Sequence, residues 1–94
     1  MDFIFEITDK TGRKIHLSKE RWNHISQEHP ETREPEEIEK ILINPEIIIQ
    51  SDRDEIVRWY FCYVKNKKRY LKVSVKYLNG YGYVITAHYT PKIQ

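Results

Sequence analysis

The second half of the chain alternates between apolar and polar residues, and this period of two commits it to β-strands. The alternation is uninterrupted from Tyr70 to Leu78, and Asn79-Gly80, a dipeptide typical of tight β-hairpins, follows directly. The period of two begins at Ile47, after two segments with helical spacing. We therefore expect an α+β fold in which helices cover one face of an antiparallel sheet.

Four strands are expected in this half, joined as an antiparallel meander: residues 47–51, 56–65, 70–78 and 83–89. A turn signal, Asp9-Lys10-Thr11-Gly12, separates two shorter strands at residues 3–7 and 14–17, which we expect to form a short N-terminal hairpin. A chain of 94 residues has room for one such unit, so we predict a single domain over residues 1–94.

Two helices are predicted between the hairpin and the sheet. The first runs from Lys19 to Glu28 or His29, with Ser18 as its N-cap and Pro30 as its stop. The second begins at Pro35 and ends before Asn44-Pro45. Its core-facing positions are spaced three and four apart: Ile38, Ile41 and Leu42.

The charges separate along the chain, although the formal net charge is only +2. Residues 1–55 contain eight Lys/Arg and all fourteen Asp/Glu, a balance of −6. Residues 56–94 contain eight Lys/Arg and no acid, a balance of +8, together with nine of the twelve aromatic residues. A basic, aromatic-rich sheet suits an anionic partner, nucleic acid above all.

Several classes of protein are not expected from this composition. The longest apolar run, Trp59 to Val64, is far shorter than the roughly 20 residues of a membrane-spanning helix. The first ten residues lack the apolar segment of a signal peptide. Cys62 is the only cysteine, so an internal disulfide is impossible. We expect a cytoplasmic protein without a membrane partner.

Assigning the two faces of the sheet locates the polar residues. The inward set is predicted to be Leu71, Val73, Val75 and Tyr77, with Val57, Trp59, Phe61 and Tyr63 from the preceding strand and Ile85 and Ala87 from the last. The outward set is then Arg58, Tyr60, Cys62, Lys72, Ser74, Lys76, Val84, Thr86, His88 and Thr90. Lys67, Lys68 and Arg69 extend the basic track at a hairpin turn, or merely solvate that turn.

Cations and hydroxyls on a sheet face bind phosphates, and aromatic rings stack on bases, so we predict that this face binds RNA. The RNA-binding set predicted from it is Tyr60, Ser74, Lys76, Lys67, Lys68 and Arg69. The alternative is an ordinary solvated sheet face, on which Lys, Thr and Tyr are common. The absence of acids over residues 56–94 argues against that alternative, because neutral surfaces usually mix both signs.

Four histidines, His16, His24, His29 and His88, supply groups that both take and give a proton near neutral pH. Cleavage of RNA by its own 2′-hydroxyl needs a base, an acid and a cation, and it needs neither a metal nor a covalent nucleophile. Histidines beside Lys or Arg on one face are a sufficient set. A histidine taken alone is more often a surface or capping residue than a catalyst.

A zinc site is the competing chemistry. His24 and Glu28 are four apart on the first helix, with His29 next to them, and such spacing can hold zinc. A second ligand pair of the usual type is lacking, so we expect neither a metal nor another cofactor. Cys62 lies inside an apolar strand, where cysteine is usually a packing residue rather than a nucleophile.

Two strings of residues are distinctive. W-x-H-I-x-x-x-H-P-E runs from Trp22 to Glu31, and V-I-T-A-H-Y runs from Val84 to Tyr89. With the amphipathic helix and the Tyr-rich strand between them, residues 15–90 resemble the phage-associated branch of the barnase–EndoU–colicin–RelE-like (BECR) nuclease superfamily. The resemblance implies N-terminal helices packed on a four-stranded antiparallel sheet. It also implies a metal-independent endoribonuclease, often a toxin of toxin–antitoxin, phage or conflict systems.

Matching this sequence to the family motifs implies a set of catalytic residues. The motif histidines are His24 and His29, the strand cation is Arg58 with Lys72 as its neighbour, and the hydroxyl of the last strand is Thr86. His88 falls two residues after that hydroxyl and completes the candidate set.

The leading hypothesis is therefore a small toxin-like ribonuclease in which His29, or else His24, deprotonates the 2′-hydroxyl. Its expected partners are RNA and an acidic antitoxin or immunity protein. Exposed edge strands make either a monomer or a homodimer plausible. The alternative is a non-catalytic module that binds RNA or an acidic protein through the same basic aromatic face.

Overall fold

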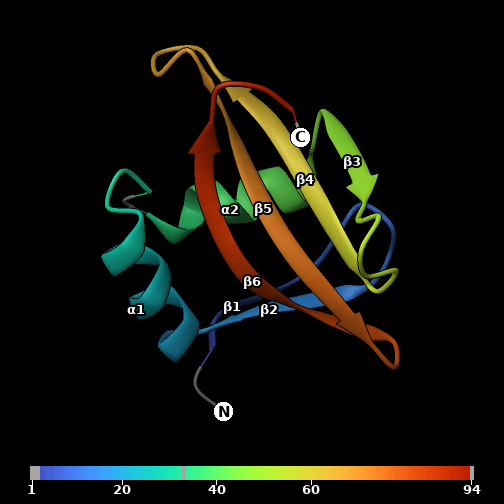
Figure 1. Ribbon diagram of the computed structural model, residues 1–94. Helices are drawn as coiled ribbons and strands as arrows, with labels where there is room; N and C mark the ends of the chain where they lie inside the picture. The colour runs from blue at the N-terminus through green and yellow to red at the C-terminus, as the bar shows by residue number, and fades with distance from the viewer. Residues whose placement is uncertain (1–2, 33, 94) are drawn as a thin grey trace.

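The computed structural model describes residues 3–32 and 34–93 and has an α+β architecture, with two helices beside a six-stranded sheet (Figure 1). Met1, Asp2, Arg33 and Gln94 lie outside the described residues, and of these Asp2 and Arg33 enter the charge counts above. The elements in chain order are β1 (Phe3–Thr8), β2 (Lys14–Ser18), α1 (Lys19–Glu28), α2 (Pro35–Ile43), β3 (Ile47–Gln50), β4 (Val57–Val64), β5 (Arg69–Leu78) and β6 (Tyr81–Thr90). Neither helix in the described part of the chain has the length and apolar character needed to cross a bilayer.

The order of strands across the sheet is β1-β2-β6-β5-β4-β3. The antiparallel meander from β3 to β6 is confirmed. The prediction of a four-stranded sheet is wrong, because β2 pairs in parallel with the start of β6 through His16↔Tyr83 and its neighbours. This pairing makes the N-terminal hairpin part of the same sheet. It also buries Ile15 and Leu17 in the common core, an apolar contact that favours closure of the hairpin onto β6.

Both helices begin and end where the sequence predicts. The Ser18 hydroxyl accepts a hydrogen bond from Arg21 N at 3.0 Å and caps α1, whose last residue precedes His29. Pro35 occupies the first turn of α2. The predicted stripe of α2 is fully or almost fully buried: Ile38, Ile41 and Leu42. α2 lies behind β4 and β5, whereas α1 lies beside β6 (Figure 1).

The predicted faces are right for β5 and wrong for β4. Leu71, Val73 and Val75 are buried in the core against the helices, as expected. The register Tyr60↔Val73 places Tyr60 in the same core, with a fully buried ring. The inward set of β4 is therefore Tyr60, Cys62 and Val64, and the set predicted to be inward (Val57, Trp59, Phe61 and Tyr63) lies on the opposite face. Because nearly every residue of β4 is apolar or aromatic, its own pattern does not choose a face.

A register shift in β6 also changes which of its residues face the core. Ser74 pairs with Thr86 but Val75 pairs with Val84, so the register skips Ile85. Val84 is therefore buried in the core, contrary to the prediction. Ile85 is half-buried and is not among the residues packed on the core cluster. The shift leaves Thr86 and His88 on the face away from the helices, as predicted.

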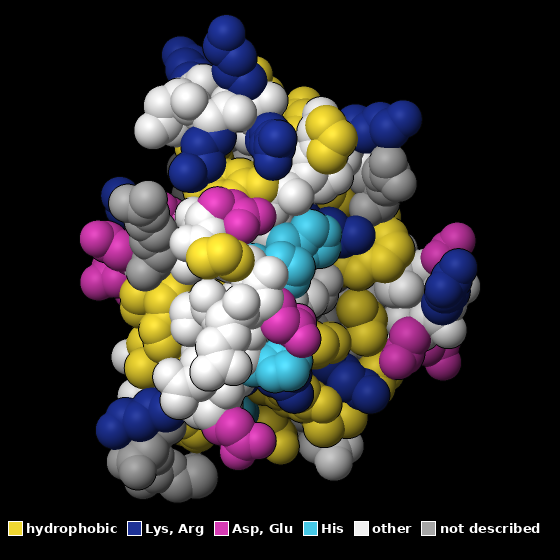
Figure 2. All heavy atoms as spheres, turned by 60° about the vertical axis from the view of Figure 1, so that its left-hand side comes forward, with side chains coloured by type: hydrophobic (Ala, Val, Ile, Leu, Met, Phe, Trp, Pro, Cys, Tyr) yellow, Lys and Arg dark blue, Asp and Glu magenta, His cyan; other side chains and the backbone are white. Residues whose placement is uncertain are grey.

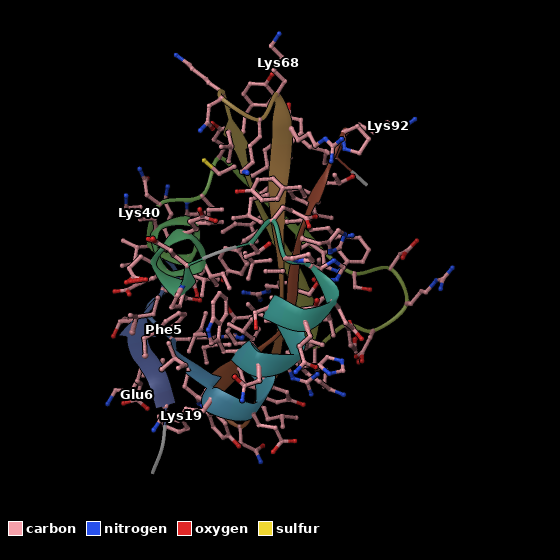
Figure 3. All side chains as sticks on the ribbon, turned by 90° about the vertical axis from the view of Figure 1, so that its left-hand side faces the viewer. Phe5, Glu6, Lys19, Lys40, Lys68 and Lys92 are labelled. Atoms are coloured by element: carbon pink, nitrogen blue, oxygen red, sulfur yellow. The ribbon has the colours of Figure 1, made fainter. Side chains whose placement is uncertain are left out.

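We call the face opposite the helices the open face. Its rows follow from the strand registers: Phe61–Lys72–His88, Trp59–Ser74–Thr86 and Val57–Lys76–Tyr83. After β6 the chain turns back across β5 toward β4 (Figure 1). Figure 3 looks along the sheet and shows Lys40 of α2 on one side and Lys92 on the other, so this returning segment lies over one end of the open face.

Candidate active site

Two histidines from different elements meet at the edge of β6. The imidazole rings of His29 and His88 stack with centroids 5.2 Å apart and planes inclined by 30°. His29 is the C-cap of α1, where its N–H donates to Ile25 O at 2.8 Å and its carbonyl accepts from Thr32 N at 2.9 Å. These backbone bonds fix the point at which the chain leaves the helix and bring the His29 side chain to β6.

A lysine completes this group from the neighbouring strand. Lys72 is the direct cross-strand partner of His88 on the open face. Its Nζ lies 4.1 Å from the centre of the Trp59 ring and 5.8 Å from that of Phe61. Cation–π contacts of this kind hold an ammonium group in a defined place. We call His29, His88 and Lys72 the histidine site.

The electrostatics of the histidine site favour a neutral His88. Burial lowers the pKa of His88 below its usual 6.5, and the positive charges of His29 and Lys72 lower it further. The negative charge of Glu31 raises the pKa of His88 but does not cancel these effects. Burial also lowers the pKa of Lys72. At neutral pH the His88 ring is therefore uncharged and able to accept a proton.

The other predicted open-face residues lie next to this site. Thr86 is two residues before His88 on the same face of β6, and it pairs with Ser74. Lys76 follows along β5, with its Nζ 4.0 Å from Asp54 Oδ2. The Thr86 hydroxyl and the Lys76 ammonium therefore continue the row away from the histidines, which is an arrangement suited to successive phosphates. Ser74 is buried, so its predicted role in binding RNA is not supported by its exposure.

His24 makes a separate contact. Its Nε2 lies 3.0 Å from Glu28 Oε2, and both side chains are 54% exposed. Figure 2 shows histidine side chains in two neighbouring patches on one face of the molecule, with an acidic side chain between them. Among the interactions of residues 3–32 and 34–93, His24 contacts Glu28 and makes no contact with the histidine site. Its predicted catalytic role stays a prediction.

The placement predicted for Arg58 and Tyr60 on the open face is wrong. Both belong to the helix side of β4, because Tyr60 pairs with the inward Val73. The guanidinium of Arg58 lies 5.2 Å from the centre of the Tyr77 ring, and the Tyr60 hydroxyl donates to Asp9 at 2.8 Å. Arg58 and Lys72 therefore lie on opposite faces and do not form one cation pair.

The basic side chains of the turn between β4 and β5 do not all lie on the same side of the sheet. Lys67 Nζ lies 5.1 Å over the ring of Tyr89, a residue of the core face. Arg69 lines a small hollow with Lys67, Tyr89 and Glu31. Lys68 occupies the tip with a positive φ of 55°. In Figure 3 it is at the far end of the molecule from Lys19. Of the three residues predicted to bind RNA at this turn, Lys67 and Arg69 thus lie toward the helix side of the sheet.

Metal ligands do not gather in the described residues. Across 3–32 and 34–93, no group of three or more His, Cys, Asp and Glu side chains is placed to hold an ion. Cys62 Sγ contacts Glu46 Oε2 at 3.7 Å. Burial and this carboxylate raise the pKa of the Cys62 thiol, which disfavours the nucleophilic thiolate.

Three residues of the sites were missed by the sequence analysis: Trp59, Glu31 and Arg13. Trp59 was assigned to the core but forms the platform under Lys72. Glu31 acts on His88 from the loop after α1. Arg13 lies 4.9 Å from the Tyr77 ring, on the same side of the sheet as Arg58. None of the three has a local pattern that signals such contacts, which depend on the packing of distant segments.

Comparison with known proteins identifies the family. The family model described as phage-Barnase-EndoU-ColicinE5/D-RelE like nuclease2 matches residues 5–94. No curated protein and no solved structure matches the chain. The helices, the meander and the two motif strings all lie within the matched region. Since the match covers all but the first four residues, the chain belongs to this family of nucleases.

Proposed function

We propose that this chain is a metal-independent endoribonuclease that cleaves single-stranded or loop RNA through attack by the 2′-hydroxyl. The observation that carries the proposal is the contact of His29 with His88 beside Lys72 on the open face. Two imidazoles can supply the base and the acid, and an ammonium can offset the charge that develops on the phosphate. Membership of a nuclease family supports the same reading.

His88 is the better candidate for the base. Its lowered pKa keeps the ring neutral at neutral pH, which is the state that accepts a proton. It also lies on a strand next to Thr86, whose hydroxyl can orient the phosphate. The sequence predicted His29, or else His24, as the base, whereas here His88 is the base and His29 is the acid.

The reaction then proceeds in one step. His88 takes the proton of the 2′-hydroxyl while the 2′-oxygen forms a bond to phosphorus, and the bond from phosphorus to the 5′-oxygen breaks. Protonated His29 gives its proton to that 5′-oxygen. The products are a 2′,3′-cyclic phosphate and a 5′-hydroxyl, and Lys72 stabilises the negative charge of the pentacoordinate phosphate.

The aromatic residues of the open face suit single-stranded substrate. Trp59 stands beside Lys72, and Tyr63 and Tyr70 form an edge-to-face pair further along the same face. Tyr83 follows opposite Lys76. Unpaired bases can be splayed and stacked on such rings, whereas the bases of a duplex cannot.

A toxin-like role is part of the same proposal. The basic half of the chain supports an acidic antitoxin or immunity protein as the partner that would cover this face. Co-purification of an acidic small protein that stops RNA cleavage is the measurement that tests this partner.

The decisive experiment is incubation of the protein with single-stranded RNA in the presence of a chelator. We expect cleavage products that end in a 2′,3′-cyclic phosphate. His88→Gln should lower the rate constant by about 10²–10⁴-fold because it removes the base. Absence of cleavage of any RNA would contradict the proposal.

His16→Gln is the matched control. Burial lowers the pKa of His16 as it does that of His88, but His16 stacks on Phe3, with ring centroids 4.2 Å apart. Its loss should leave the cleavage rate close to that of the wild type. RNA that binds without being cut, with the same affinity in His88→Gln, would select the non-catalytic binding module instead.

A further inference from the structure

A cleft with two arginines opens at the end of the sheet away from α1. It has a volume of about 530 Å³ and lies where the β1–β2, β3–β4 and β5–β6 turns converge. Its lining includes Arg13, Arg58, Tyr77, Gln50, Glu55 and Gly80. We call it the arginine cleft.

The two arginines are held on one aromatic ring. The guanidinium carbons of Arg13 and Arg58 lie 4.9 and 5.2 Å from the centre of the Tyr77 ring. Stacking on an aromatic face fixes a guanidinium while leaving its N–H donors available at the edge. Within residues 3–32 and 34–93, neither arginine has a carboxylate within ion-pair distance, although Glu55 also lines the cleft.

The ring beneath the arginines is rigidly mounted. The Tyr77 hydroxyl donates to Asp9 Oδ2 at 2.5 Å, and Tyr60 donates to the same oxygen at 2.8 Å. Asp9 Oδ1 accepts from Thr11 N and from Arg13 N, each at 2.9 Å. One buried carboxylate therefore ties the turn that carries Arg13 to the ring on which Arg13 stacks. Each fixed guanidinium presents its N–H donors as a planar fork, which matches the oxygens of a phosphate.

Strand β5 joins this cleft to the histidine site. Lys72, Ser74 and Lys76 follow one another along its open face, and Leu78 at its end lines the arginine cleft. From Lys72 to Leu78 the distance is about 20 Å at the usual rise of a strand. A single strand of nucleic acid laid along this row would pass the ammonium groups of Lys72 and Lys76, whereas Ser74 between them is buried. At Leu78 it would turn over the end of the sheet to reach the two arginines on the helix side.

We propose that the arginine cleft is a second phosphate-binding subsite, which grips the backbone of a nucleic acid whose scissile phosphate lies at the histidine site. The inference rests on the proposed nuclease function. It assigns Arg13 and Arg58 to substrate binding at a distance from the reaction. An acidic protein segment is the competing occupant, since carboxylates also bind paired guanidiniums.

The test uses a single-stranded deoxyoligonucleotide of about 16 nucleotides, which spans the path and lacks the 2′-hydroxyl needed for cleavage. Its affinity is measured by fluorescence anisotropy over a range of salt concentrations. Each phosphate neutralised on a single strand contributes about −0.7 to the slope of log K against log salt. The double variant Arg13→Gln/Arg58→Gln should therefore have a slope less steep than the wild type by about 1.4.

A matched control removes two positive charges elsewhere. Lys40 on α2 and Arg53 in the β3–β4 turn do not line the cleft, so Lys40→Gln/Arg53→Gln should retain the wild-type slope. Glu55→Gln keeps both arginines and removes the acid from the lining, so it should tighten binding. This single variant tests the subsite even if the double variant does not fold.

The results separate the two proposals. Equal slopes for the wild type and the arginine variant, in a protein that cleaves RNA, would overturn the subsite and leave the nuclease standing. A less steep slope in a protein that cleaves no RNA would support phosphate binding in the cleft and overturn the reaction. Arginine side-chain NMR signals that shift with an oligoglutamate peptide, and not with the oligonucleotide, would assign the cleft to an acidic protein and overturn the subsite.

Discussion

The two ends of strand β5 bear polar clusters of opposite character. At one end Lys72 faces His88 and His29, in a half-buried group on the open face. At the other end Tyr77 meets Asp9 in a cluster of buried hydrogen bonds on the helix side. Both clusters contain titratable groups, yet only the first contains histidines that are placed to take and give protons.

The pKa values show why the clusters differ. Burial alone raises the pKa of Asp9, but hydrogen bonds from Tyr77, Thr11 and the backbone of Arg13 outweigh it and lower the pKa overall. At His88 burial itself lowers the pKa, and positive neighbours add to the effect. A fully hydrogen-bonded carboxylate stabilises the fold, whereas a histidine kept neutral by its surroundings is prepared to take a proton.

The largest effect on stability is expected from Asp9→Asn. The amide cannot accept from both tyrosine hydroxyls and from the turn backbone at once, so buried donors lose their partner. We expect the free energy of unfolding to fall by about 3 kcal/mol, measured by urea denaturation. A loss of less than about 0.5 kcal/mol would show that the cluster is not the structural element inferred above.

The pH dependence of that difference gives a second check. The folded-state pKa of Asp9 lies below its usual 3.8, so the unfolded chain binds the proton more readily. The contribution of Asp9 to stability is therefore present above pH 3.8 and is lost as the pH falls through the folded-state pKa. The gap between the wild type and Asp9→Asn should narrow at acid pH.

A smaller loss of stability is expected from Gly82→Ala. Gly82 lies opposite Tyr77, and an added Cβ would lie 3.0 Å from two carbons of its ring and 3.1 Å from Val75 Cγ1. Overpacking of this kind costs on the order of 1 kcal/mol, measured as a change in the free energy of unfolding. In a Tyr77→Leu background the cost should fall without vanishing, because the contact with Val75 Cγ1 remains. An unchanged cost there would refute the clash with the ring.

The smallest effects are expected at the histidine site, where two charge changes should move the pKa of His88 in opposite directions. Lys72→Gln removes a positive neighbour and should raise it, while Glu31→Gln removes a negative neighbour and should lower it. Titration of the His88 ring signals by NMR measures both shifts without any need for activity. Shifts of the same sign in both variants would contradict the arrangement described here.

Much of the secondary structure could be predicted because local patterns encode it. The Ser18 cap, the Pro30 stop and the Asn79-Gly80 turn are local features, and each is found where expected. The open-face positions of Lys72, Thr86 and His88 were also predicted, since their strands alternate clearly there. The faces of β4 could not be predicted, because a strand of mostly aromatic and apolar residues fits either register.

The sequence by itself determined the elements, their turns, the separation of charge and the family. Tertiary structure alone decided which polar residues meet: His29 with His88, and Arg13 with Arg58 over Tyr77. These meetings depend on the parallel pairing of β2 with β6 and on the register of β4 with β5. Both are long-range choices set by burial of a shared core, and no short stretch of sequence specifies them.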